Sequence, residues 1–245
     1  MSHFDFGFGP VPAHRHSHGG GWVANTAYVS DTAFVGINAR VFGDARIFDN
    51  VRIRDNALVF GNALIRGNAL VFDNALVFGN ARVSDNVWVY DNAQICGNAQ
   101  VFGNARIRDN ALVFGNAVIF DNARIFDNAR IFGNAQVCGN AQVCGNARIF
   151  DDAQVFDNAL IRGDAHVFGN ARVSGDSQVS GNAVIRGNSR VFDNARVFGD
   201  ALVFGNSQVC GNAQVSGDAL VFGNSQVCGN AQVSGNAVIF DIPVS

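Results

Sequence analysis

The sequence predicts an all-β fold, a parallel β-helix whose coils have three sides and 18 residues each. Three observations lead to this prediction: a six-residue unit repeats without insertion or deletion, two of its positions are nearly uniform, and phenylalanine concentrates on every third unit. Such strict periodicity is typical of solenoids. We expect about 12 coils over residues 21–242, an N-terminal tail at 1–20 that could cover the first coil, and a C-terminal end at 243–245.

The composition supports strands and turns rather than helices. The 245 residues contain 17 basic residues, all of them Arg, and 20 acidic residues, all of them Asp. The helix-favouring Lys and Glu are therefore absent, whereas Asn, Asp and 28 Gly recur throughout. This alphabet favours short strands separated by tight turns.

The six-residue unit has two inward-facing columns. From Ala27 onward it occurs 36 times, with Ala at the first position in 30 units and Val or Ile at the third position in all of them. Positions two apart lie on the same side of a strand, so both columns are expected to face the core. The second position, occupied by Arg, Gln, Leu or Val, then faces outward.

The fifth and sixth positions are expected to form the corners. The fifth is Gly or Asp from Gly43 onward, and the sixth is Asn or Asp from Asp44 to Asn236. Gly and Asn enter left-handed backbone conformations at little cost, which turns the chain after each strand. We expect the Asn side chains to stack into corner ladders joined by amide hydrogen bonds.

The number of sides per coil follows from the fourth position. It holds 18 Phe, and sorting the units into 18-residue coils places Phe at 10 of the 12 positions on one side. Coils of 12 or 24 residues give no such segregation. Segments 207–224 and 225–242 also match at 13 of 18 positions.

This repeat resembles the bacterial hexapeptide-repeat family. The resemblance is carried by the run of Val or Ile, any residue, Gly or Asp, Asn or Asp, then Ala, Ser or Val, and covers about Gly21 to Phe240. It implies a left-handed, triangular parallel β-helix. In detail, the segment Gly19-Gly20-Gly21-Trp22-Val23-Ala24 is similar to uncharacterised bacterial and phage-encoded members labelled transferases.

Characterised members of that family are mostly acyltransferases, with some carbonic anhydrases. The acyltransferases generally use a His base near a subunit boundary and loops extruded from the coils, whereas the repeats here extrude no loop and contain a single His, His166, in an outward column. The carbonic anhydrases need three zinc-binding His in the repeats. We therefore expect no catalytic residue and no cofactor, with an acyltransferase-like enzyme or a small-ligand binder as the alternative.

The N-terminal tail contains two groups of alternating residues, one of His and one of Phe. His14, His16 and His18 alternate and are candidate ligands for zinc, copper or nickel, although a flexible polar tail is the favoured interpretation. Phe4, Phe6 and Phe8 also alternate, as in one short strand.

Cys210 and Cys228 lie one coil apart in one column. A disulfide between them is conceivable, but free thiols are expected in a reducing cytoplasm.

The Phe-rich side is the candidate interface. Its outward second position is also apolar in seven of 12 coils, which predicts an apolar stripe larger than monomers usually expose. The alternative is that the rings fold over the corner and need no partner. The interface residues are Phe42, Phe60, Phe78, Phe114, Phe132, Phe150, Phe168, Phe204, Phe222, Phe240, Leu58, Leu76, Leu112, Leu202 and Leu220.

Charge and hydropathy limit the partners. The formal net charge of −3 gives no general reason to bind nucleic acid or anionic lipid, and no apolar run is long enough for a membrane span. We expect a cytoplasmic, non-catalytic scaffold that forms a homo-oligomer, a dimer in preference to a trimer.

Overall fold

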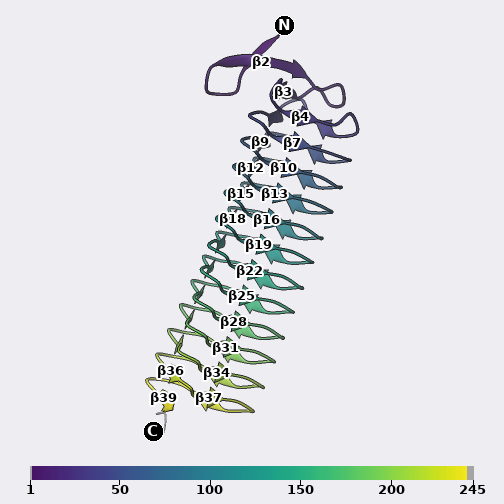
Figure 1. Ribbon diagram of the computed structural model, residues 1–245. Helices are drawn as coiled ribbons and strands as arrows, with labels where there is room; N and C mark the ends of the chain where they lie inside the picture. The colour runs from purple at the N-terminus through teal and green to yellow at the C-terminus, as the bar shows by residue number, and fades with distance from the viewer. Residues whose placement is uncertain (1, 242–245) are drawn as a thin grey trace. The chain divides into compact units, whose positions relative to one another are not determined.

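The computed structural model describes residues 2–241 and divides the chain into two compact units, Met1–Asp121 and Asn122–Ser245. Both units consist of short strands joined by turns (Figure 1). The described residues include no helix, and so none that is long and apolar enough to span a membrane. Residue 242 and the C-terminal end at 243–245, with its Pro243, lie outside the described residues.

The N-terminal unit has three sheets, which we call N1, N2 and N3. Sheet N1 contains β1 (His3–Asp5), β2 (Pro10–Arg15), β3 (Trp22–Ala24), β6 (Arg40–Val41), β9 (Leu58–Val59), β12 (Leu76–Val77), β15 (Gln94–Ile95) and β18 (Leu112–Val113). Sheet N2 contains β4 (Tyr28–Val29), β7 (Arg46–Ile47), β10 (Leu64–Ile65), β13 (Arg82–Val83), β16 (Gln100–Val101) and β19 (Val118–Ile119). Sheet N3 contains β5 (Phe34–Val35), β8 (Arg52–Ile53), β11 (Leu70–Val71), β14 (Trp88–Val89) and β17 (Arg106–Ile107).

The C-terminal unit repeats this arrangement in sheets C1, C2 and C3. Sheet C1 contains β21 (Arg130–Ile131), β24 (Arg148–Ile149), β27 (His166–Val167), β30 (Val184–Ile185), β33 (Leu202–Val203), β36 (Leu220–Gly223) and β39 (Val238–Asp241). Sheet C2 contains β22 (Gln136–Val137), β25 (Gln154–Val155), β28 (Arg172–Val173), β31 (Arg190–Val191), β34 (Gln208–Val209) and β37 (Gln226–Val227). Sheet C3 contains β20 (Arg124–Ile125), β23 (Gln142–Val143), β26 (Leu160–Ile161), β29 (Gln178–Val179), β32 (Arg196–Val197), β35 (Gln214–Val215) and β38 (Gln232–Val233).

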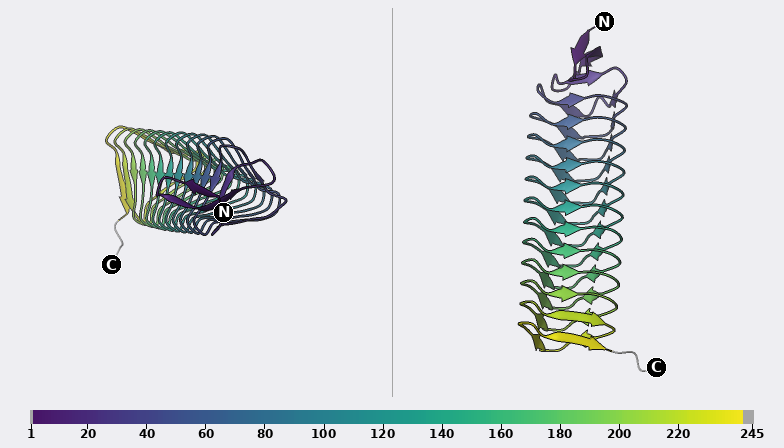
Figure 2. Two further views of the ribbon diagram at one scale, coloured as in Figure 1. Left: turned by 90° about the horizontal axis from the view of Figure 1, so that it is seen from above. Right: turned by 90° about the vertical axis from the view of Figure 1, so that its left-hand side faces the viewer.

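The predicted coil of three sides and 18 residues is confirmed in both units. In the N-terminal unit, Leu58 pairs in parallel with Leu76, and the Leu58 amide donates to the Ala75 carbonyl at 3.0 Å. In the C-terminal unit, Leu202 pairs with Leu220 in the same way. Figure 2 shows the strands of each sheet recurring at the same place in successive coils of a unit. Each unit is therefore a parallel β-solenoid, held together along its axis by coil-to-coil hydrogen bonds.

The first and third positions of the unit line the core, as predicted. Ala57 and Val59, like nearly all residues in these two columns, are completely buried. The side chains that replace Ala are buried as well: Val51 and Val87 are completely inaccessible to solvent, and so is the hydroxyl-bearing Ser177. An interior of small and branched residues keeps the cross-section narrow and dry.

The corners depend on positive φ angles at the fifth position. Gly61 has a φ of +70° and Asp85 a φ of +64°, so both occupy the left-handed region. Sixth-position Asn side chains form the predicted ladders: the Asn62 amide donates to Asn80 at 3.1 Å, and Asn80 donates to Asn98 at 3.0 Å. Where Asp occupies this position, it accepts but cannot donate onward, as Asp152 does from Asn134 at 2.9 Å.

Fifth-position Asp adds a bond that the sequence analysis missed. The Asp85 carboxylate accepts the amide hydrogen of Gly103 in the next coil at 3.0 Å, and Asp193 accepts that of Gly211 at 3.1 Å. An L residue in the left-handed region is strained, but this charge-assisted hydrogen bond offsets the strain. Asp can therefore replace Gly at the corner, because its hydrogen bond to the next coil offsets the strain of the positive φ angle.

The N-terminal tail forms an antiparallel hairpin, which corrects the expectation of a flexible polar tail. Strand β1 pairs with β2, and β2 pairs with β3 of the first coil through Ala13 and Ala24. The alternating Phe residues do not share one strand, because β1 ends at Asp5 and its carboxylate accepts the amide of Gly7 at 2.7 Å. The hairpin covers part of the first coil, whose strand edge would otherwise be open.

Candidate functional site

A stack of aromatic rings lies on sheet N1 at the fourth position. The Phe42 and Phe60 ring centroids are 4.8 Å apart with an interplanar angle of 3°, and Phe60 and Phe78 are 4.9 Å apart at 4°. Phe6 of the hairpin region stacks on Phe42 at 4.9 Å. The tail therefore extends the ring stack of the N-terminal unit.

Sheet C1 carries two stacks of the same type. The first joins Phe132, Phe150 and Phe168 with centroid distances of 4.9 and 4.6 Å. The second joins Phe204, Phe222 and Phe240 with distances of 5.0 and 5.5 Å, and the guanidinium of Arg186 lies over the Phe204 ring at 4.9 Å. Each ring covers the face of its neighbour, which leaves the other rings half-buried while the terminal Phe240 is 52% exposed.

All of the sequence-predicted interface residues lie on sheets N1 and C1. Those on or directly after N1 strands are Phe42, Phe60, Phe78, Phe114, Leu58, Leu76 and Leu112; those on C1 are Phe132, Phe150, Phe168, Phe204, Phe222, Phe240, Leu202 and Leu220. Every one is half-buried except Phe240. Within each unit, the predicted interface residues therefore lie on one sheet.

The predicted continuous stripe is broken within each unit. Gln94 interrupts the Leu column of sheet N1, and Arg130, Arg148 and His166 occupy the first three outward positions of sheet C1. The longest apolar run is on C1. We call it the C1 patch: Val184, Leu202, Leu220 and Val238 in register, with Phe204, Phe222 and Phe240 beside them.

Cys96 occupies a fourth position of sheet N1, where its neighbours one coil away are Phe78 and Phe114. Burial raises the pKa of the Cys96 thiol, because the charged thiolate loses hydration. The raised pKa disfavours the reactive thiolate form.

His166 is half-buried on β27, in register with Arg148 and Val184. Its pKa is lowered by burial and by the positive charge of Arg148, and Asp164 opposes this shift. The imidazole contacts the Phe150 ring edge-on at a centroid distance of 6.4 Å.

The three His residues of the tail have separate roles. His14 bonds to the Asn25 side chain at 2.9 Å and His18 to the Ala33 carbonyl at 3.2 Å, while the buried His16 accepts the amide hydrogen of His18 at 3.3 Å. Within residues 2–241, no three His, Cys, Asp or Glu side chains form a cluster that could hold a metal ion. The structure therefore does not assemble the candidate metal site.

Cys210 and Cys228 form a disulfide, with their Cα atoms 4.5 Å apart, where free thiols were expected. The bond joins neighbouring coils of sheet C2. The register explains it, because Val209 pairs with Val227 and the two Cys residues follow them directly.

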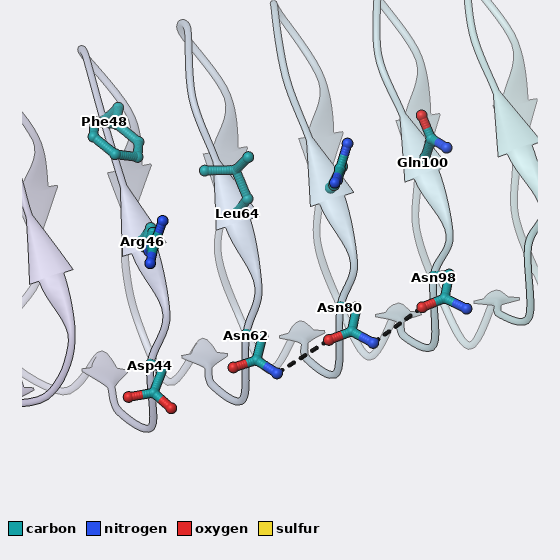
Figure 3. Close-up of a pocket in the computed structure, with 9 residues that line it drawn as sticks. Asp44, Arg46, Phe48, Asn62, Leu64, Asn80, Asn98 and Gln100 are labelled. Carbon is teal, nitrogen blue, oxygen red and sulfur yellow. Dashed lines mark hydrogen bonds between the residues drawn. The ribbon is translucent and has the colours of Figure 1, made fainter.

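A groove of about 790 Å³ lies on sheet N2. Figure 3 shows Arg46, Leu64 and Gln100 projecting along it, with the Asn ladder at its edge. Asn62 and Asn80 each donate to the next Asn, so their amides are already partly used within the protein. The Arg side chains and the Asn and Gln amides make this groove polar, and Phe48 is the one aromatic side chain among its lining residues.

Comparison with known families agrees with this architecture. The family model described as the YdcK β-solenoid repeat matches seven segments, residues 75–91, 93–108, 123–139, 141–153, 165–181, 195–211 and 213–229. The chain is a β-helix repeat protein. The matched segments fall in both units, and the hexapeptide-repeat resemblance is thereby supported at the level of the repeat.

One solved structure similar to this β-helix protein is the UDP-N-acetylglucosamine acyltransferase of Francisella novicida. The two chains are 17% identical, the TM-score is 0.37, and the match covers 77% of this chain and 66% of that chain. This β-helix protein thus spans slightly less than two thirds of the acyltransferase's length. No curated protein matches the sequence.

Proposed function

We propose that this β-helix protein is a non-catalytic structural and interaction scaffold that self-associates through its Phe- and Leu-rich surface, with the C1 patch as the main contact. The observation that carries the proposal is the run of four outward aliphatic side chains in register beside stacked Phe rings. Val238 and Phe240 are 48% and 52% exposed, so part of this apolar surface is in water in the single chain.

Apolar burial is the physical reason for association. A homodimer would bury the same patch on both copies, as in most symmetric oligomers. Burial of apolar surface contributes roughly 25 cal/mol per Å², so covering the C1 patch would favour association if the two surfaces are complementary. The remaining outward positions of C1, Arg130, Arg148 and His166, would then lie at the polar rim.

Oligomeric mass tests this proposal. We expect light scattering at micromolar concentration to give twice the protomer mass of 26.0 kDa, with three times that mass indicating a trimer. The double substitution Leu202→Arg and Leu220→Arg should return the protein to the protomer mass, because positive charges without an opposite partner would be desolvated at the interface. The matched control, Gln208→Arg and Gln226→Arg in the same two coils of sheet C2, should leave the oligomer intact.

A wild-type protein at 26.0 kDa under these conditions would refute self-association.

The alternative is an acyltransferase-like enzyme with His166 as the base. Its lowered pKa would keep the imidazole neutral near pH 7, as a base requires. Turnover of acyl-CoA that disappears in His166→Ala, with the fold retained, would favour this alternative over a non-catalytic scaffold.

A further inference from the structure

Sheet C2 contains a gap in its column of fourth-position side chains. Ser174 lies between Phe156 in the preceding coil and Phe192 in the following coil. On sheet C1, adjacent Phe rings cover one another at 4.6–5.5 Å. Within the described residues, neither Phe156 nor Phe192 stacks on another aromatic ring, so the small Ser174 leaves the facing sides of both rings uncovered by a ring.

The register fixes the width of this gap, which we call the Ser174 notch. Val155, Val173 and Val191 pair in successive strands, and Phe156, Ser174 and Phe192 follow them directly. Adjacent strands are about 4.8 Å apart, so the two rings are separated by roughly 10 Å. A ring placed midway would be about 5 Å from each, the spacing at which this chain stacks its own Phe rings. The groove at this place has a volume of about 320 Å³, enough for a small ligand.

Two guanidinium groups lie at the same groove. Arg172 and Arg190 are exposed, pair in register on β28 and β31, and line the notch. In the described part of the chain, neither has an ion-pair partner within 4 Å. Like charges directly opposite one another on neighbouring strands are unfavourable, and an anion held by both would remove that cost.

The acidic groups of the groove are already engaged. The Asp157 carboxylate accepts the amide hydrogen of Gly175 at 3.1 Å, and Asp193 accepts that of Gly211 at 3.1 Å. Both belong to the corner beyond the rings, whereas the Arg residues lie on the strands before them. The groove is therefore cationic on the strand side and acidic on the corner side.

We propose that the Ser174 notch binds a planar aromatic carboxylate. The aromatic ring of the ligand inserts between Phe156 and Phe192, and its carboxylate accepts hydrogen bonds from Arg172 and Arg190. This ligand site does not depend on self-association and goes beyond the scaffold role.

The N-terminal unit offers a natural comparison. Ser84 also lines a groove, of about 360 Å³, but it is flanked by Arg66 on one side and Phe102 on the other. Its hydroxyl bonds to the Asp85 carboxylate at 3.3 Å. With one ring in place of two, this groove cannot enclose a ligand ring between aromatic faces. Cys96 on sheet N1 also lies between two rings, Phe78 and Phe114, but the outward neighbours there are Leu76, Gln94 and Leu112, which supply no cation for a carboxylate. We therefore expect one carboxylate-binding site per chain.

The test uses 2-naphthoate as the probe and its saturated analogue, decahydro-2-naphthoate, as the control ligand of equal charge. Fluorescence and calorimetric titrations of the full chain should show one equivalent of 2-naphthoate bound at millimolar or lower concentration, with the saturated acid at least 10-fold weaker. Ser174→Phe should abolish binding, because the new ring completes the column that sheet C1 already shows to be compatible with the fold. Ser84→Phe, the matched control, should leave the affinity unchanged.

A second variant keeps the test independent of folding effects in Ser174→Phe. The double substitution Arg172→Gln and Arg190→Gln changes only exposed side chains and should weaken 2-naphthoate binding at least 10-fold. Equal affinity for the saturated acid, unchanged binding in either Ser174→Phe or the double Arg variant, or no binding of 2-naphthoate at millimolar concentration would each overturn the proposal.

Discussion

The four Ser residues of the core column provide the sharpest test of the packing. Ser177 and Ser207 are both completely buried at the first position, where 30 of 36 units have Ala. The Ser207 hydroxyl donates to the Phe204 carbonyl at 2.9 Å, whereas the Ser177 hydroxyl is the one buried side-chain polar atom without a hydrogen-bond partner in residues 2–241. The same substitution at these two sites should therefore have opposite effects.

The expected magnitudes follow from the hydrogen-bonding difference. An unpaired buried hydroxyl costs about 1–3 kcal/mol, so Ser177→Ala should raise the free energy of unfolding by about that amount. Ser207→Ala removes a hydrogen bond with a net contribution of about 0.5–1.5 kcal/mol and should lower the free energy of unfolding. Both replacements introduce the residue that the column already prefers, so neither should disturb the packing.

Urea denaturation followed by circular dichroism measures the difference, provided that the slope of the free energy with urea is the same in both variants. Amide exchange at the neighbouring coils adds a local readout, because repeat proteins can unfold in parts. If Ser177→Ala destabilises the protein as much as Ser207→Ala, the assignment of hydrogen bonds inside the core is wrong.

Three further perturbations test other parts of the structure. Val143→Asp places an unpaired charge in the core and should cost at least several kcal/mol, with unfolding of the adjacent coils measured by amide exchange. Gln142→Asp on the outer face should be tolerated, and equal effects of the two substitutions would contradict the assignment of the third position to the core. Asp85→Ala should destabilise by about 1–3 kcal/mol in urea denaturation, because it loses a coil-to-coil bond and keeps a positive φ, and Asp85→Gly should be milder; the reverse order would refute the corner argument. The pKa of His166 should lie below its ordinary value of 6.5 in an NMR titration, and Arg148→Gln should raise that pKa. Because the unfolded chain binds more protons than the folded chain in this range, the contribution of His166 to stability is present above pH 6.5 and is lost as pH falls through the folded pKa. A titration without a shift would contradict the described environment of His166.

The sequence was sufficient for the architecture because the repeat fixes its own geometry. Val59 and Val77 are interchangeable members of one column, so a single correct assignment of the inward side applies to every coil. The segregation of Phe among the sides gave the 18-residue coil. The hand of the coil came only from the resemblance, since composition and spacing are the same for both hands.

Features that depend on particular side-chain contacts, and not on the repeat pattern itself, were harder to predict. The bond from Asp85 to the Gly103 amide links residues 18 apart and depends on the backbone angle of the corner. The hairpin was hidden because its Phe residues alternate as in one strand, while Asp5 in fact ends that strand with a local turn. The disulfide depended on redox conditions that the sequence does not state.

The candidate site was predictable in position but not in extent. The six-residue periodicity placed Phe and Leu on sheets N1 and C1. It nevertheless predicted a continuous apolar stripe, although Arg130 and Arg148 interrupt that stripe. Counting residues on one side also overlooked the Ser174 notch on sheet C2, because a gap between two rings becomes visible only when neighbouring coils are stacked.

The central claim is that residues 18 apart lie directly above one another, and mapping of disulfides in the mildly oxidised protein tests it most directly. The Cα atoms of Cys210 and Cys228 are 4.5 Å apart, so the account predicts a peptide pair linked between these two residues by mass spectrometry, which disappears on reduction. A dominant link between Cys138 and Cys144, six residues apart, or the absence of a link between Cys210 and Cys228 after oxidation, would contradict the 18-residue coil.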